Sequence, residues 1–103
     1  MVYLHVIAHA ERRKMSEFAE NFEKRAIPLQ RKHGQRLVGA WQTTIGVYDE
    51  VTAIYVFDSL AEMDRIRREI REDQPAWTEY ISRSVLGYEA SKVMVSLPYS
   101  PLQ

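Results

Sequence analysis

The sequence contains no cysteine, and its 103 residues include only four glycines and four prolines. The lack of cysteine excludes disulfide bonds, thiolate metal sites and cysteine nucleophiles. The formal net charge is zero, so the chain lacks the basic excess carried by general nucleic-acid binders and by proteins that bind anionic membranes. Apolar runs extend over only a few residues, far fewer than a membrane span requires.

The overall composition indicates one globular domain over residues 1–103. Hydrophobic residues make up 46% of the chain and charged residues 27%, as in ordinary soluble proteins. The first residues, MVYLHVIAHAE, lead directly into a strand pattern without a basic region or a cleavage-site signature. We therefore expect a single domain in the cytoplasm.

Residues 51–57 are apolar on both faces if they form a strand, in which alternate side chains point to opposite sides. One face would carry Val51, Ala53, Tyr55 and Phe57, and the other Thr52, Ile54 and Val56. A small antiparallel sheet normally packs one face and exposes the other, so the second face needs a cover. We predict that a second copy of the chain supplies it, with Ile54 and Val56 in the interface. The pattern leaves open which face meets the helices.

Strand and helix patterns alternate along the chain. Strands are predicted at residues 2–9, 36–46, 51–57 and 88–97, and helices at residues 14–33 and 59–73, with an extra short helix that starts at Pro75. The order βαββαβ is that of the ferredoxin-like α+β fold, in which a four-stranded antiparallel sheet carries two helices on one face.

Three local signals add detail to this order. Pro28 should kink or end the first helix. Ser59 and Glu62 form the pattern of a capping box, in which the serine hydroxyl accepts from a helix-start N–H and the glutamate reaches back. Strict alternation in the second strand places Leu37 and Trp41 on the same face.

A series of short motifs, in order, resembles the NIPSNAP family. The motifs are Leu37-Val38-Gly39-Ala40-Trp41, Thr43-Thr44-Ile45-Gly46, Ile54-Tyr55-Val56-Phe57, Asp58-Ser59-Leu60-Ala61, the spaced Asp73, Trp77 and Tyr80, and Leu97-Pro98-Tyr99-Ser100-Pro101-Leu102. Together they extend over nearly the whole chain. The resemblance implies a dimeric α/β barrel, in which two ferredoxin-like subunits pack sheet on sheet.

The resemblance implies little about chemistry. NIPSNAP-like proteins are linked to vesicle transport and mitochondrial signalling in animals, without an established catalytic mechanism. Relatives on the wider dimeric α/β-barrel scaffold include cofactor-free monooxygenases, haem-degrading enzymes and small isomerases, and the fold alone does not select among them. We expect a homodimer that binds a small apolar or aromatic ligand or a protein partner. The alternative is a cofactor-free monooxygenase or isomerase.

No motif of a known catalytic class is present. The sequence has no glycine-rich phosphate loop, no HExxH, no GxSxG and no paired-acid motif, and no cofactor or metal is expected. His5 and His9 share a strand face but lie about 13 Å apart along a strand, too far to bind one metal ion. His33 precedes a glycine and is expected to act as a cation at a helix C-terminus.

Five residues are candidates for a ligand site: His5, Trp41, Tyr55, Trp77 and Tyr80. His5 lies in mid-strand and is the candidate acid/base group or haem ligand; the alternative is a hydrogen-bonded core or interface histidine. Large aromatic side chains with polar tips often line ligand sites. Trp41 and Tyr55 would line a pocket between sheet and helices, which Trp77 and Tyr80 would close. The alternative is that all four aromatics belong to the core.

Overall fold

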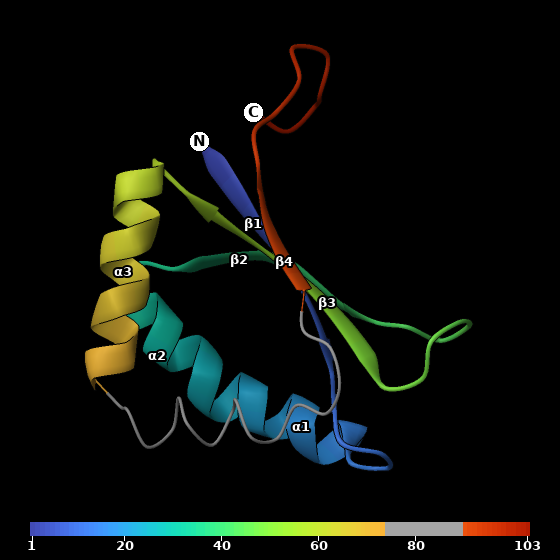
Figure 1. The fold of residues 1–103 in the computed structure, drawn as a ribbon. Coiled ribbons are helices and arrows are strands. Elements are labelled where there is room, and N and C mark those ends of the chain that lie inside the picture. The colour runs from blue at the N-terminus through green and yellow to red at the C-terminus, as the bar shows by residue number, and fades with distance from the viewer. Residues whose placement is uncertain (74–89) are drawn as a thin grey trace.

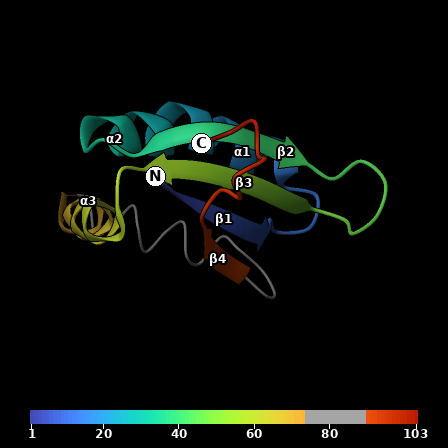
Figure 2. The same ribbon diagram turned by 90° about the horizontal axis from the view of Figure 1, so that it is seen from above.

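The strands form one antiparallel sheet in the order β2-β3-β1-β4. In the computed structural model, which describes residues 1–73 and 90–103, they are β1 (Val2–His9), β2 (Arg36–Gln42), β3 (Glu50–Phe57) and β4 (Ala90–Met94). Figure 2 shows the four strands side by side in this order. β2 and β4 are shorter than predicted, because the ladder with β3 ends at Gln42 and the ladder with β1 at Met94.

The helical segments lie on one side of this sheet (Figure 1). They are α1 (Met15–Asn21), η1 (Phe22–Ala26), α2 (Ile27–Lys32) and α3 (Leu60–Asp73). This is the predicted ferredoxin-like arrangement. The extra short helix expected from Pro75 lies outside the described residues. Within the two described ranges, no helix is long and apolar enough to cross a membrane.

The face of β3 that carries Ala53, Tyr55 and Phe57 meets the helices. All three side chains are buried, and Phe57 keeps only 1% of its surface exposed. They form one core cluster with Leu4 of β1 and Ile66 of α3. Because side chains alternate along a strand, the opposite face of the sheet is the one on which none of the described helices lies, the face without helices.

A bulge in β2 corrects the predicted face of one residue. Leu37 pairs with Tyr55 on the helix-covered face, whereas Trp41 pairs with Thr52 on the other face, and the register shifts between Leu37 and Gly39. A bulge adds one unpaired residue to a strand and so reverses the alternation beyond it. The prediction that Leu37 and Trp41 share a face is therefore wrong.

The first helical segment runs through Pro28 instead of ending there. The N–H of Ile27 donates to the carbonyl of Phe22, five residues back, which makes η1 a π-helical turn. Pro28 has no N–H for the carbonyl of Lys24, the acceptor of a regular helix, and its ring crowds that carbonyl. The wider turn relieves the conflict, and α2 continues to Lys32.

The capping box at the start of α3 forms only in part. The hydroxyl of Ser59 accepts from the N–H of Glu62 at 3.1 Å, as predicted for an N-cap. The carboxylate of Glu62 instead lies 2.6 Å from Arg65 one turn further along the helix. A side-chain ion pair on the exposed helix surface replaces the predicted return contact.

Candidate functional site

A cavity of about 310 Å³ lies between the first helical segment and the sheet. Its walls come from β1, β2 and β3 on one side and from α1, η1 and the first residue of α2 on the other. The volume is at the lower end of the range for small-molecule sites, roughly 300–1,000 Å³. The cavity therefore has room for a small ligand.

Small side chains on the sheet create this space. Ala53 in β3 lies between Val6 of β1 and Ala40 of β2, and Ala8 of β1 also lines the cavity. The adjacent position along β3 on this face is occupied by the large side chain of Tyr55. Three alanines on three strands thus form a hollow beside the tyrosine ring.

Aromatic and aliphatic side chains form the helical wall. The rings of Phe18 and Phe22 stack with centroids 5.9 Å apart and an angle of 26° between their planes. Met15 and Ile27 extend this wall on either side along the chain. An apolar ligand would gain dispersion contacts with both walls.

Among the described residues, three polar side chains also line the cavity: Glu23, Gln42 and Tyr55. Glu23 and Gln42 are exposed and lie toward solvent, whereas Tyr55 is buried. The Tyr55 hydroxyl accepts a hydrogen bond from the side chain of Gln30 at 3.2 Å. Burial raises the pKa of the Tyr55 phenol, so its hydroxyl stays protonated at neutral pH.

The structure divides the predicted ligand residues between the two faces of the sheet. Tyr55 and Trp41 both border the cavity, although Trp41 pairs with Thr52 on the face without helices. His5 is absent from the described lining, because it pairs with Ile54 and Lys92 on the face without helices. Trp77 and Tyr80 lie outside the described residues.

The ring of Trp41 crosses the neighbouring position on β2. A Cβ atom added at Gly39 would lie 2.6 Å from Cη2 of Trp41. Gly39 and Trp41 pair with Ile54 and Thr52 on the face without helices, and Trp41 keeps 54% of its surface exposed. The tryptophan therefore presents an indole plane to solvent at the edge of the sheet.

Sequence reasoning missed the helical wall and Glu23. Met15, Phe18 and Phe22 follow a helical stripe, which is more often core than ligand site. The matching signal on the sheet is a set of small residues on three strands, the paired Ala40 and Ala53 and the nearby Ala8, which pairs with Val51. That coincidence appears only when the strand register is known.

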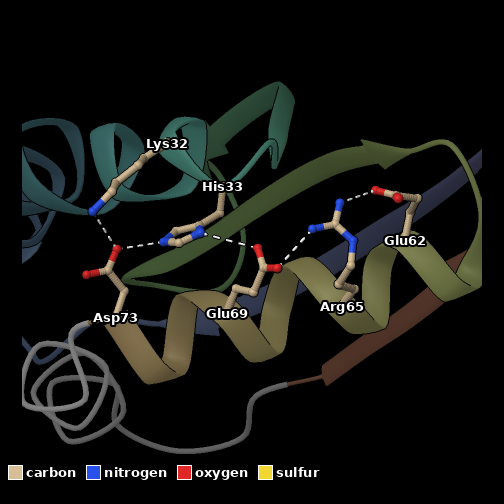
Figure 3. Close-up of polar contacts among 6 residues, drawn as sticks. All are labelled: Lys32, His33, Glu62, Arg65, Glu69 and Asp73. Atoms are coloured by element: carbon tan, nitrogen blue, oxygen red, sulfur yellow. Dashed lines mark hydrogen bonds and ion pairs between the residues drawn. The ribbon is translucent and has the colours of Figure 1, made fainter.

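A chain of ion pairs joins α2 to α3, as Figure 3 shows, and none of its members lines the cavity. Its members are Lys32, His33, Asp73, Glu69, Arg65 and Glu62. Asp73 accepts from Lys32 at 2.9 Å and lies 2.6 Å from Nε2 of His33. These contacts, that of Lys32 first, hold the pKa of Asp73 below its ordinary value. His33 lies at the C-terminal end of α2, as predicted. There it contacts Glu69 and Asp73 of α3.

Glu50 and the histidine at the end of β1 form a separate cross-strand pair. Nε2 of His9 lies 3.4 Å from the carboxylate of Glu50. Across the described ranges, no group of three or more His, Cys, Asp or Glu side chains is placed to hold a metal ion.

The family model for NIPSNAP proteins matches residues 9–101. The chain belongs to the NIPSNAP family. The match includes the motif segments on which the sequence resemblance is based, except for Leu102, the last residue of the sixth segment. No curated protein matches the sequence.

Solved structures of other NIPSNAP proteins share the whole fold. A NIPSNAP family protein from Agrobacterium tumefaciens is 22% identical, with a TM-score of 0.90, over 99% of this chain and 98% of that one. A second protein from Agrobacterium tumefaciens is 25% identical, with a TM-score of 0.87, over the full length of both chains (100% of each).

The fold also extends beyond the family. A protein described as an antibiotic biosynthesis monooxygenase is 9% identical, with a TM-score of 0.70, over 95% of this chain and 100% of that one. At this level of identity the likeness concerns the fold alone.

Proposed function

We propose that this NIPSNAP protein is a homodimer that binds a small apolar ligand between its helices and its sheet. The cavity beside Tyr55 is the observation on which the ligand proposal depends. Its described walls are mainly alanine, aromatic and aliphatic side chains. Of the polar side chains in these walls, Tyr55 is buried beside the alanines, and Glu23 and Gln42 lie toward solvent. Apolar walls with few polar groups are the usual composition of a small-molecule site.

The face of the sheet without helices supports the dimer. Ile54 and Val56 lie on this face, where the ring of Trp41 is also exposed. Burying one such aliphatic side chain contributes about 1.5–3 kcal/mol. A second copy of the same sheet would cover this face and remove it from water.

Two projecting segments also support a partner. The hairpin between β2 and β3 and the C-terminal tail extend away from the sheet (Figure 1). Ile45 and Tyr48 in the hairpin are 96% and 89% exposed, and Tyr99 in the tail is 83% exposed. The two segments project in different directions, and each carries large apolar side chains that contact with a partner would remove from water.

Sedimentation equilibrium tests the dimer. We expect the wild type to be a dimer at micromolar concentration and the Ile54→Asp and Val56→Asp variants to be folded monomers. Leu60→Asp is the control, because Leu60 is an exposed aliphatic residue that starts α3 on the helical side, away from the proposed interface. A monomeric wild type, or a dimer unaffected by both variants, would refute sheet-to-sheet pairing.

Toluene tests the ligand cavity as a minimal aromatic probe. We expect the backbone amide resonances of Ala8, Ala40 and Ala53 to shift when toluene is added in a ¹H–¹⁵N NMR titration. Apolar cavities can bind benzene-sized molecules. Ala40→Leu should weaken the response by filling part of the space. Shifts spread over the surface, or unaffected by Ala40→Leu, would place binding elsewhere.

A cofactor-free monooxygenase or isomerase is the second candidate function. The likeness of the fold to an antibiotic biosynthesis monooxygenase favours it, and so does the presence of a cavity. Glu23 and Tyr55 are the titratable groups of the described lining, whereas His5 lies on the other face of the sheet. Oxygen uptake with an electron-rich polyphenol, lost in Glu23→Gln but retained in His5→Ala, would support an enzyme that uses this cavity.

A further inference from the structure

Glu23 is the one charged residue among the described residues that line the cavity. Its side chain is exposed, so it lies where the cavity meets solvent. The neighbouring wall residues, Phe22 and Ile27, are apolar. A ligand that fills the cavity would therefore meet a carboxylate where it leaves the apolar walls.

Two nearby lysines on the same segment already have acidic partners. Nζ of Lys24 lies 2.6 Å from the carboxylate of Glu20, and Nζ of Lys14 lies 3.1 Å from that of Glu11. The charge of Lys24 also attracts the carboxylate of Glu23, but no ion pair within residues 1–73 and 90–103 includes Glu23. The carboxylate at the edge of the cavity is therefore available to a cationic group of a ligand.

The other polar groups among the described lining residues do not supply a positive charge. Gln42 is neutral, and burial keeps the Tyr55 phenol protonated by raising its pKa. Because the Tyr55 hydroxyl already accepts from Gln30, its own hydrogen remains to donate to a ligand atom. None of these groups would offset the repulsion between Glu23 and an anionic ligand.

We propose that the cavity selects an amphiphile with a cationic head group, which binds Glu23 while its apolar tail lies between the Phe18–Phe22 wall and the alanines of the sheet. This inference depends on the proposed ligand cavity. It excludes fatty-acid anions as preferred ligands, since their carboxylate would face Glu23. Ion pairs at exposed sites are weak. The preference for a cationic head group is therefore expected only between ligands whose apolar tails have the same length.

Three compounds with the same seven-carbon alkyl tail and different head groups test the proposal: heptylamine, heptanol and octanoate. Binding is followed by NMR titration of the amides of Ala40, Val51 and Ala53 at about pH 7, where the amine is protonated and the acid ionised. We expect heptylamine to bind about three- to tenfold more tightly than octanoate, with heptanol between them. The preference should diminish at about 0.5 M NaCl, which screens exposed charges.

Glu23→Gln removes the charge and keeps the shape of the side chain, so it should reduce the preference for the amine to less than about twofold. Glu17→Gln is the matched control, because it makes the same change of net charge on an exposed residue of α1 that does not line the cavity. Tighter binding of octanoate, or a preference unchanged by Glu23→Gln, would overturn the cationic head group and leave the cavity intact. Failure of all three compounds to shift these amides would overturn the ligand cavity itself.

Discussion

Nε2 of His33 lies 2.6 Å from Oδ2 of Asp73, across 40 positions of the sequence. The contact joins the residue that ends α2 to the last residue of α3. Lys32 reaches the same carboxylate oxygen. Asp73 is therefore the acid that holds the ends of the two helices together.

Asp73→Asn should lower the melting temperature at neutral pH and have less effect in acid. The pKa of Asp73 is lowered in the fold, so its contribution is present above the pKa of an unfolded aspartate, about 3.9, and is lost as the pH falls through the lower folded value. Thermal unfolding by circular dichroism from neutral to acidic pH measures this. Asp64→Asn removes only a pair within α3, at 3.8 Å, and should change the melting temperature less at every pH. Equal curves for the two variants would contradict the prediction.

Tyr55→Phe should reduce the free energy of unfolding by about 1 kcal/mol. The substitution removes the hydroxyl that accepts from Gln30 but keeps the buried ring in the core. Urea denaturation measures the loss. Tyr48→Phe, at a residue that is 89% exposed, should leave the free energy unchanged, and an equal loss in both variants would mean that the Gln30 contact contributes nothing.

Gly39→Ala should displace the indole of Trp41 with little loss of stability. The added Cβ would lie 2.6 Å from Cη2, but that atom is the far end of an exposed side chain that can move. We expect a shift of the Trp41 indole N–H resonance, assigned with Trp41→Phe, and a change of no more than about 1 kcal/mol in the free energy of unfolding. In the Trp41→Ala background the same substitution should cause no strain. An unchanged indole resonance would show that the ring does not cross Gly39.

Ile66→Ala should destabilise the fold by about 2–5 kcal/mol, the range for large-to-small changes in a core. Ile66 is 4% exposed and packs in the cluster with Tyr55 and Phe57. Leu60→Ala on the same helix is the control, since Leu60 is 57% exposed and loses little buried area. Comparable losses at the two positions, measured by urea denaturation, would mean that α3 does not pack on the sheet through Ile66.

Local sequence patterns were sufficient to predict the elements of the fold. The alternation in residues 2–9 and 51–57 and the apolar stripe of the helix after Ser59 correspond to β1, β3 and α3. These patterns depend on contacts between near neighbours in the chain, so they can be read directly. The family motifs were sufficient to predict the NIPSNAP family.

The site could be predicted only in part, because its walls meet through strand register. Tyr55 was expected at a sheet–helix pocket and borders the cavity. Trp41 was expected inside the same pocket, but the bulge between Leu37 and Gly39 places its pairing on the other face. A single inserted residue reverses the side of every later side chain. Gly39, at the bulge, is the one local signal of the insertion, since glycine inside a strand often marks a bulge.

The sequence by itself determined the order of the elements, the two apolar faces of residues 51–57 and the lack of thiol chemistry. Only the tertiary structure decided which of these faces meets the helices, since that choice depends on how the helical connections cross the sheet and not on alternation along one strand. It also brought Ala8, Ala40 and Ala53 together beneath Phe18 and Phe22. A cavity is a property of side chains from distant parts of the chain, and their distance in space is set by the fold.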